Sequence, residues 1–167
     1  QQACSTKFNF GSSKTMSVAQ KLYEGKDIGS ETVGLISYMR TDSTRLSDVF
    51  VSSAKSFIEE NYGKEYVGSV KVSKKKDNVQ DAHEAIRPTS IKRTPESVKS
   101  YLSSDEYKLY SIIYYRALAS LMKDAKVIQT SIEMDNNNYI FKTTGQITKF
   151  DGFMKVYSEY MNSEDVM

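Results

Sequence analysis

The sequence predicts a mainly helical α+β protein, and three observations support that fold class. Three segments place apolar residues at helical spacing. Two segments after residue 124 alternate instead and are rich in Val, Ile and Thr, as antiparallel strands are. The 167 residues are 39% hydrophobic and 26% charged, which is ordinary for a globular chain. We therefore expect a helical body followed by a short antiparallel β segment.

The helices are predicted from the spacing of apolar residues together with residues that begin and end helices. Gly25 and Gly63 each follow a periodic segment, where a helix ordinarily ends. Ser103 and Glu106 have the spacing of a capping box at the start of the most apolar segment. The predicted helices are residues 1–8, 14–24 and 47–62, a short helix that starts at Thr94, and a central helix over residues 104–123.

The order of the elements predicts the domain organisation. Two helices joined by a turn, then a predicted strand over residues 34–39, follow the order of a winged-helix unit, although an ordinary helical hairpin is more common. Further strands are expected over residues 126–134, 139–148 and 153–157. We expect a winged-helix-like domain over residues 1–124, a β segment over 125–160 and a frayed tail over 161–167. Because the sequence begins with Gln1, we also expect it to be part of a longer chain.

Composition excludes several classes of protein. Cys4 is the only cysteine, so the chain has no internal disulfide and no cysteine-based metal site. No apolar run approaches the roughly 20 residues of a membrane helix. The sequence contains no nucleotide-binding glycine loop. Its acidic residues do not have a metal-binding spacing. The net charge of +2 does not by itself indicate nucleic acid. The basic run Lys71, Lys74, Lys75 and Lys76 is more often a solvated loop than a phosphate-binding patch.

Two short segments carry polar groups that core packing does not require. In residues 37–43, a strand would direct Tyr38, Arg40 and Asp42 to one side. A tyrosine hydroxyl is a weak nucleophile at neutral pH, and a neighbouring cation favours its ionised form. Arginine also binds phosphate with paired donors. Together these groups suit nucleophilic attack on a phosphodiester, although a strand-end tyrosine beside a surface ion pair is the more common arrangement.

The second segment, residues 80–89, contains His83, the only histidine of the chain. If residues 80–87 form a short helix that Pro88 ends, His83 and Arg87 lie on one helix face. Both side chains can then donate to a phosphate, and histidine can also move a proton near neutral pH. A lone histidine is more often a solvated surface residue, so this segment alone does not assign a function.

These two segments resemble the hallmark motifs of bacterial type IA DNA topoisomerases. Residues 34–45 (GLISYMRTDSTR) are similar to the active-site tyrosine motif of that family, and residues 80–89 (QDAHEAIRPT) are similar to its second motif. Residues 1–25 and 149–153 are similar to segments that flank the two motifs in the family. The resemblance covers nearly the whole chain, in order. It implies that residues 1–124 are the domain with the active-site tyrosine and that the β segment over residues 125–160 belongs to the adjoining hinge or arch domain.

The resemblance implies a role for each matching residue. Tyr38 would attack a DNA phosphodiester and form a 5′-phosphotyrosine link, and Arg40 would position the scissile phosphate and stabilise its charge. Asp42 would orient Arg40 or its neighbours, and His83 and Arg87 would contact the DNA backbone near the break. The resemblance further implies strand passage and resealing by the 3′-hydroxyl, which relaxes negative supercoils without ATP.

The sequence departs from the family pattern at two places. Ser37 stands where threonine is more usual, and the loop over residues 26–33 is longer than in some relatives. We expect neither departure to harm the chemistry, because both leave Tyr38, Arg40 and the second motif in place.

The resemblance also implies partners and a location. The expected partners are single-stranded and negatively supercoiled DNA, together with the Toprim and arch domains of the same polypeptide, and no membrane. We expect no cofactor in this chain, Mg²⁺ bound by the acidic Toprim domain, a cytoplasmic location at the bacterial nucleoid, and no activity of the chain alone. Two alternatives stay open: a non-catalytic winged-helix-like DNA-binding module, and a structural interaction domain whose tyrosines only pack.

Overall fold

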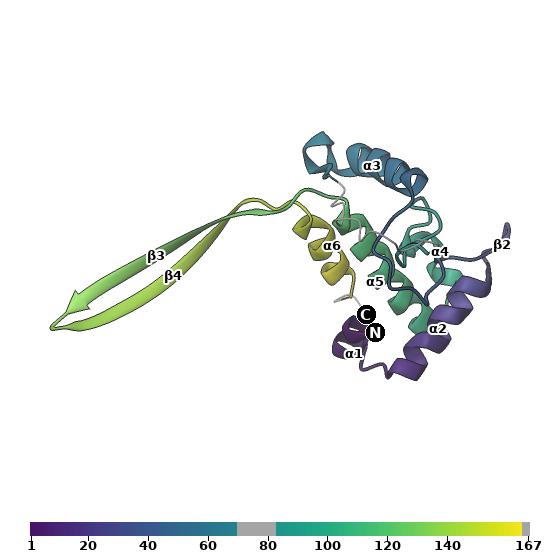
Figure 1. The fold of residues 1–167 in the computed structure, drawn as a ribbon, viewed down its shortest axis with the longest axis horizontal. Helices are drawn as coiled ribbons and strands as arrows, with labels where there is room; N and C mark the ends of the chain where they lie inside the picture. Colours follow the sequence, from purple (N-terminus) through teal and green to yellow (C-terminus); the bar gives the residue numbers. More distant parts are fainter. Residues whose placement is uncertain (70–82, 165–167) are drawn as a thin grey trace, which may run out of the picture.

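The computed structural model describes residues 1–69 and 83–164, with side chains described except at residues 159 and 161–164. A helical body carries a long two-stranded hairpin that projects away from it (Figure 1). The predicted mainly helical α+β fold is therefore confirmed. The helices are α1 (Gln2–Phe8), α2 (Ser12–Glu24), α3 (Asp48–Tyr62), α4 (Pro95–Val98), α5 (Ser104–Ser120) and α6 (Met154–Glu164). The strands are β1 (Lys26–Asp27), β2 (Thr32–Val33), β3 (Lys126–Asn136) and β4 (Tyr139–Phe150).

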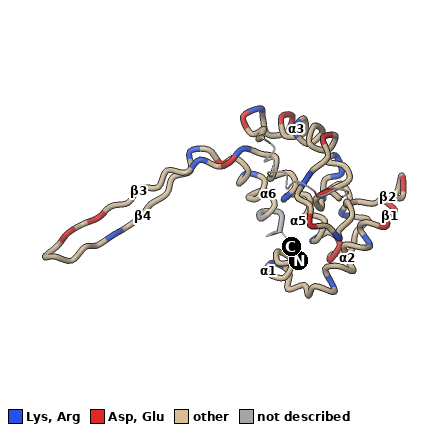
Figure 2. Tube along the Cα trace, viewed as in Figure 1, with Lys and Arg blue, Asp and Glu red and all other residues tan. Residues whose placement is uncertain are grey.

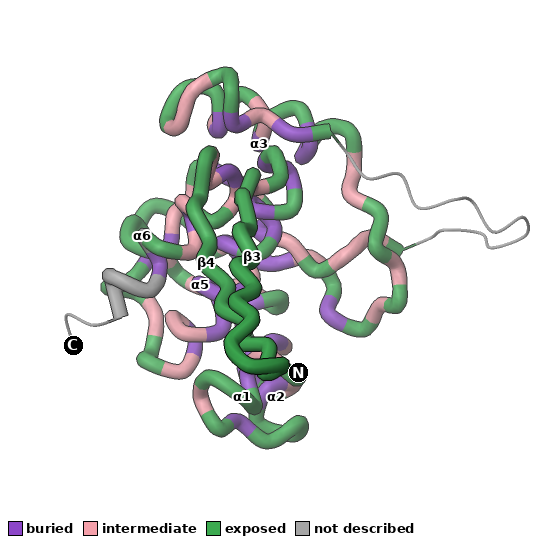
Figure 3. The backbone as a smooth tube through the Cα atoms, turned by 90° about the vertical axis from the view of Figure 1, so that its left-hand side faces the viewer, coloured by how far each residue is buried: buried purple, intermediate pink, exposed green. Residues whose placement is uncertain are grey.

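Helix α5 forms the centre of the core, as its apolar sequence predicts. Helices α2, α4 and α6 all pack against it, and the buried segments of the body gather around it, whereas the hairpin is exposed along nearly its whole length (Figure 3). Of the predicted core residues of α5, Leu109, Ile112 and Leu118 are buried and Ile113 is partly buried. Removing this apolar stripe from water stabilises the fold by roughly 25 cal/mol for each Å² of apolar surface buried. This gain in free energy accounts for the central position of the helix.

Buried tyrosines fasten α5 to the segment that precedes α4. The hydroxyls of Tyr110 and Tyr114 donate to the backbone carbonyls of Arg93 and Ile91, both at 2.7 Å. Burial raises the pKa of both hydroxyls, so they stay protonated and act only as donors here. These bonds hold residues 91–93, which continue the second polar segment, rigidly against the core.

The N-terminus of α5 holds a largely buried ion pair. The predicted capping box forms: Ser103 Oγ accepts from the Glu106 N–H at 3.4 Å, and Glu106 Oε2 accepts from the Ser103 N–H at 3.0 Å. Glu106 Oε1 also accepts from Lys26 Nζ at 2.8 Å. Burial by itself would raise the pKa of the Glu106 carboxyl, but the bonds from Lys26 and Ser103 hold it below its ordinary value.

We expect Glu106→Ala to lower the free energy of unfolding by about 2–3 kcal/mol, because it removes both the cap and the partner of Lys26. Glu133→Ala is the matched control. It breaks the exposed ion pair with Lys142, 2.9 Å long on the hairpin, and should change stability by about 0.5 kcal/mol or less. Urea unfolding of the two variants compares them directly, and equal losses would contradict the structural importance of the buried pair.

The hairpin is regular except at its base, where the register shifts between Lys126 and Val127. Strands β3 and β4 pair antiparallel from Lys126 opposite Phe150 to Asn136 opposite Tyr139. Asn137 and Asn138 form the turn with φ of 51° and 66°, a left-handed conformation that asparagine tolerates in two-residue hairpin turns. The two predicted strands are therefore confirmed, and each is two residues longer than expected at its end.

Three element predictions are wrong, and a fourth is wrong in part. Residues 153–157 are not a third strand: α6 occupies this region, and its Val156 and Tyr160, four residues apart, are buried. Residues 34–39 form no strand beyond a single bridge between Ile36 and Pro88, and the expected loop at residues 26–33 contains the small β1–β2 hairpin. Residues 161–164 of the expected frayed tail continue α6.

Some predicted features fall on residues that the structure does not describe. The lysine run at residues 71–76, residues 80–82 of the second motif and residues 165–167 of the tail lie outside the described ranges. The division of the chain at residue 124 stays a prediction. What the structure adds is that α6 follows the hairpin and packs against α5.

Candidate functional site

The two polar segments lie side by side in the structure. Ile36 forms an antiparallel bridge with Pro88, flanked by a bond from the Ser37 N–H to the Arg87 carbonyl and one from the Thr89 N–H to the Leu35 carbonyl, both 2.9 Å. Segments 50 residues apart in the chain are thereby fixed against each other. The sequence related the two motifs only through the family resemblance, whereas the structure shows that they are in direct contact.

The Ser37 hydroxyl explains why the pairing stops after one bridge. It donates to the carbonyl of Ala85 at 2.8 Å and accepts from the Arg87 N–H at 2.9 Å. A side chain thus takes the backbone groups that a longer ladder would use. Threonine carries the same hydroxyl, so serine at this position retains the function that the more usual residue provides.

Tyr38 projects from this junction toward solvent. Its neighbours Ile36 and Met39 are buried and anchor the backbone, whereas the Tyr38 side chain is 41% exposed. The Tyr38 ring lies 5.3 Å from the Tyr23 ring and 6.3 Å from the His83 ring, measured between centroids. A hollow of about 210 Å³ adjoins it, lined by Ser37, Tyr38, His83 and Glu84. The phenol is therefore accessible, and its ring lies near two aromatic neighbours.

Tyr23 is a neighbour that sequence reasoning missed. Tyr23 lies near the end of the helix predicted over residues 14–24, where helical spacing alone favours a packing role, but its side chain is 40% exposed and faces Tyr38. It can do so because Gly34 passes directly over the end of α2: a Cβ at Gly34 would lie 2.6 Å from the Tyr23 carbonyl oxygen. The sequence hints at this contact only weakly: Tyr23 stands in the last turn of α2, next to Gly25, where the helix ends.

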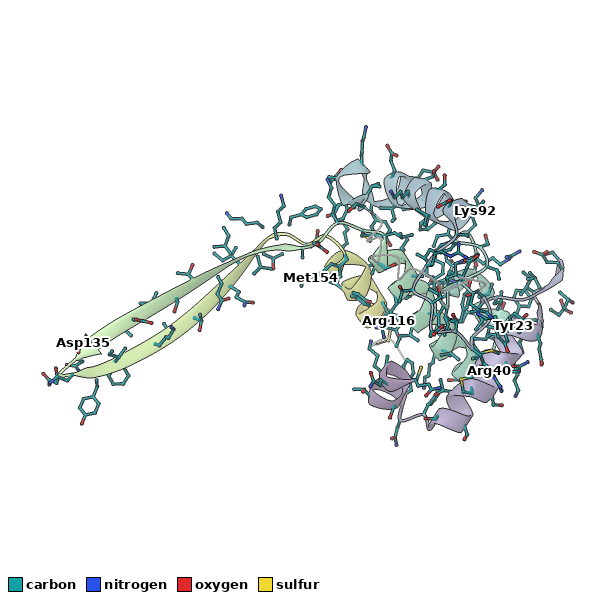
Figure 4. All side chains as sticks on the ribbon, in the orientation of Figure 1. Tyr23, Arg40, Lys92, Arg116, Asp135 and Met154 are labelled. Carbon is teal, nitrogen blue, oxygen red and sulfur yellow. The ribbon has the colours of Figure 1, made fainter. Side chains whose placement is uncertain are left out.

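Arg40 and Asp42 follow Tyr38 on an irregular segment. The expected strand alternation is wrong here, because residues 37–47 form no regular strand. Both side chains are exposed, and within the described part of the chain neither makes a hydrogen bond or ion pair. Figure 4 places Arg40, like Tyr23, at the end of the body away from the hairpin. The Arg40 guanidinium is therefore open to solvent, two residues after Tyr38 in the chain.

Arg87 is placed differently from the prediction. Residues 83–87 are not helical, so His83 and Arg87 do not share a helix face. The Arg87 guanidinium turns inward, where it donates to Glu84 at 2.7 Å, to the Pro88 carbonyl at 3.0 Å and to Ser47 Oγ at 3.3 Å, 4.7 Å from the Phe50 ring centre. Arg87 thus links the second motif to the N-terminus of α3.

The segment that carries Tyr38, residues 37–47 (called here the Tyr38 segment), is hydrogen-bonded at both ends to the second motif. Beyond the contacts of Ser37, the Ala85 N–H donates to the Arg45 carbonyl at 2.8 Å, and the Ser47 N–H donates to Glu84 Oε2 at 3.3 Å. The hydrogen bond from Arg87 is the largest effect that holds the pKa of the Glu84 carboxyl below its ordinary value. Glu84 is consequently a carboxylate at neutral pH and orients both Arg87 and the start of α3.

We expect Glu84→Gln to destabilise the protein modestly at neutral pH, by about 1 kcal/mol, because it replaces a charge-assisted bond by a neutral one. Because the pKa of Glu84 is lowered in the folded protein, its charge contributes fully to the free energy of unfolding at pH values above the range in which unfolded carboxyls titrate. This contribution disappears as the pH falls through the folded pKa. The melting temperatures of the two proteins should therefore differ at pH 7 and converge only at acidic pH, below the range in which unfolded carboxyls titrate; a constant difference would show that the Glu84 charge plays no part.

The part of the chain that the structure describes bears on two kinds of feature, namely clusters of metal-ligating side chains and helices able to span a membrane. Residues 1–69 and 83–164 contain no group of three or more His, Cys, Asp or Glu side chains that could hold a metal ion. Among the helices within these ranges, none is long and apolar enough to cross a membrane. The side chains that line the hollow beside Tyr38 are a phenol, an imidazole, a hydroxyl and a carboxylate.

Comparisons with known proteins agree on one family. The family model described as DNA topoisomerase matches residues 1–167. The chain belongs to the DNA topoisomerase family. It is 45% identical to DNA topoisomerase 1 of Rickettsia prowazekii over 170 residues, and 45% identical to that of Rickettsia felis over 168 residues. These alignments cover 99% and 98% of the chain but only 22% of each relative.

The fold of this topoisomerase chain is also found in a solved relative. Full-length topoisomerase I of Thermotoga maritima matches it with a TM-score of 0.83 and 43% sequence identity, over 94% of this chain and 25% of that one. The chain thus spans about a quarter or less of the relatives that it matches.

Proposed function

We propose that this chain is the tyrosine-bearing part of a type IA DNA topoisomerase, which cuts and reseals one DNA strand to relax negative supercoils without ATP. The observation that carries the proposal is the position of Tyr38, which is exposed, close to the rings of Tyr23 and His83, and beside an open hollow. Membership of the DNA topoisomerase family supports it.

In the proposed reaction, Tyr38 Oη attacks the phosphorus of a DNA phosphodiester. A bond forms between the tyrosine oxygen and phosphorus, the bond from phosphorus to the 3′-oxygen breaks, and the proton lost by the phenol is balanced by one gained by the 3′-oxygen. The other strand passes through the gap, and the 3′-hydroxyl then attacks the phosphotyrosine to reverse the step. Because the covalent link keeps one phosphodiester-like bond at all times, no nucleotide hydrolysis is needed.

The neighbours of Tyr38 suit distinct roles in this reaction. Arg40 is exposed, so its guanidinium can hold the scissile phosphate and stabilise charge on its oxygens. His83, across the hollow, can donate to the same or an adjacent phosphate. Asp42 would orient Arg40 or neighbouring groups. Arg87 is bound internally by Glu84 and Ser47, so we propose that it serves the DNA contact mainly by positioning the segment that carries His83.

The remaining parts of the enzyme are proposed to lie outside this chain. The described residues do not fit a metal, so we assign Mg²⁺ to an acidic Toprim domain of the same polypeptide, and no step above depends on it. The proposed partners are single-stranded and negatively supercoiled DNA together with the Toprim and arch domains. The proposed location is the cytoplasm, at the bacterial nucleoid.

A plasmid relaxation assay tests the proposal. We expect the full-length protein that carries this chain to relax negatively supercoiled plasmid with Mg²⁺ and without ATP, and the isolated 167-residue chain to give no relaxation under the same conditions. Tyr38-dependent relaxation by the isolated chain would contradict the need for outside domains. A full-length protein that binds DNA but never changes its linking number would favour the alternative, a non-catalytic DNA-binding module.

A further inference from the structure

Tyr23 presents an aromatic ring to solvent beside Tyr38, and the proposed reaction makes no use of that ring. The Tyr23 side chain is 40% exposed, and its ring centroid lies 5.3 Å from that of Tyr38. The two ring planes are tilted by 60°, so the rings do not cover each other's faces as two stacked rings would. Among the residues that the structure describes, none forms a hydrogen bond with the Tyr23 hydroxyl. The ring is therefore an open aromatic surface next to the candidate nucleophile.

The backbone holds Tyr23 in place before any ligand binds. The Leu35 N–H donates to the carbonyl of Leu22, the residue before Tyr23, at 2.8 Å, and the Leu22 side chain is buried. Gly34 passes so close to the Tyr23 carbonyl that a Cβ there would clash with it. The end of α2 is thereby fixed against the residues that lead to Tyr38. An aromatic ring on a fixed backbone loses little conformational entropy when it binds a ligand.

The cations near this ring favour a polyanion over an apolar peptide as the ligand. Arg40 lies two residues after Tyr38, is exposed, and makes no hydrogen bond or ion pair within residues 1–69 and 83–164. A guanidinium without an acidic partner is suited to binding phosphate. His83, whose ring centroid lies 6.3 Å from that of Tyr38, can also donate to a phosphate oxygen. Aromatic faces beside cations are the usual combination in sites for single-stranded nucleic acid.

The general electrostatic attraction that this chain offers to DNA is small. Its net charge is only +2, and Figure 2 shows Lys and Arg interspersed with Asp and Glu over the helical body. Affinity for the DNA backbone rises with the number of phosphates that cations neutralise, so contacts with the bases contribute a larger share of the binding here. Stacking of one base on an aromatic side chain strengthens binding by about 5- to 150-fold.

We propose that the Tyr23 ring stacks against an unpaired nucleobase that flanks the scissile phosphate. The inference rests on the proposed function, which places that phosphate at the Tyr38 hydroxyl. A flanking base is joined to the phosphate through a single sugar, so it comes within reach of a ring that contacts Tyr38. The residues that line the hollow beside Tyr38 do not include Tyr23, so the phosphate and the base occupy different places. Because the bases of a duplex are already stacked and paired, this contact selects single-stranded DNA.

Photo-cross-linking to the unaltered full-length protein tests this contact without a substitution that could disturb folding. A single-stranded oligonucleotide carries the photoreactive base iodouracil at one of the two positions that flank the cleavage site or, as the matched control, several nucleotides away. Iodouracil links on illumination to an aromatic ring against which it is stacked. We expect a cross-link to Tyr23 from one flanking position and none from the control position. Cross-links only to Tyr38 or His83, no cross-link to Tyr23, or equal yields from the control position would each overturn the proposal.

A binding cycle between protein and DNA gives an independent readout. Full-length protein with Tyr38→Phe, which lacks the expected nucleophile, is compared with the same protein carrying Tyr23→Leu or Tyr23→Phe in addition. Removing the flanking base from the oligonucleotide should weaken binding by about 5- to 150-fold when residue 23 is Tyr or Phe. The same removal should have little effect with Tyr23→Leu, which has no flat ring. Losses from Tyr23→Leu and from the missing base that simply multiply, or a Tyr23→Phe protein that behaves like Tyr23→Leu, would contradict stacking.

The stacking contact and the proposed function fail in different ways. A protein that forms the Tyr38 adduct but shows neither the cross-link nor the coupling to the flanking base refutes the stacking alone. If no adduct forms, the oligonucleotide has no cleavage site, and iodouracil is instead placed at each position in turn. A cross-link to Tyr23 in that case refutes the cleavage by Tyr38 together with the position assigned to the base, and leaves Tyr23 only as a contact to single-stranded DNA.

Discussion

Tyr38→Phe is expected to abolish DNA cleavage and the covalent protein–DNA adduct in the full-length enzyme. The substitution removes only the hydroxyl and keeps the ring that lies 5.3 Å from Tyr23 and 6.3 Å from His83. Folding and noncovalent DNA binding should therefore stay nearly unchanged. The measurement is trapping of the adduct on a denaturing gel with end-labelled single-stranded DNA.

Tyr23→Phe is the matched control for this experiment. Tyr23 is 40% exposed and Tyr38 is 41% exposed, and their rings are in contact, so accessibility alone does not distinguish the two phenols as nucleophiles. Tyr23→Phe should still form the adduct. An adduct that survives Tyr38→Phe but is lost in Tyr23→Phe would move the nucleophile to the end of α2, and an adduct in both variants would place it on another residue.

Much of the helical body could be predicted from the sequence because its signals are local. The capping residues Ser103 and Glu106 and the apolar spacing of α5 were sufficient to place the central helix. Residues 153–157 were assigned wrongly because a short apolar run fits a strand and a helix equally well. What decides between them is the surface of α5, against which Val156 and Tyr160 are buried, and no local pattern contains that information.

The candidate site was predictable in its residue types but not in its geometry. The motifs identified Tyr38 and His83, and the structure brings their rings together. The sequence did not show that Arg87 would turn inward, because an arginine that binds phosphate and one that binds Glu84 look the same in a motif. The alternation expected after Tyr38 failed because the Ser37 hydroxyl, rather than a neighbouring strand, takes the backbone groups of residues 85 and 87.

The inward position of Arg87 makes Arg40 the candidate for the catalytic cation. A guanidinium that already has three acceptors within hydrogen-bond distance must give some of them up before it can grip a phosphate with paired donors. Arg40 has no such partner in the described part of the chain and lies two residues after Tyr38 on the exposed segment. The two arginines should therefore respond differently to substitution, Arg40 through the chemistry and Arg87 through the stability of the Tyr38 segment.

Arg40→Ala is accordingly expected to slow cleavage by about 10²- to 10³-fold, the usual loss when one preorganised contact to a reacting oxyanion is removed. The adduct should still form at long times, because Tyr38 is intact. Arg40→Lys should recover only part of the rate, since a single ammonium cannot hold a phosphate with two parallel donors. Rates of adduct formation under single-turnover conditions measure both effects.

Arg116→Ala is the control for the loss of one positive charge. Arg116 is exposed on α5, and Figure 4 separates it from Arg40, so its removal lowers the net charge equally without touching the site. If Arg40 acts only through the general attraction of DNA, the two alanine variants will lose cleavage rate to the same small extent, and added salt will reduce both differences. If Arg40 holds the scissile phosphate beside Tyr38, only Arg40→Ala will be slow, and the defect will persist when DNA is saturating, because the missing contact then belongs to the cleavage step rather than to binding.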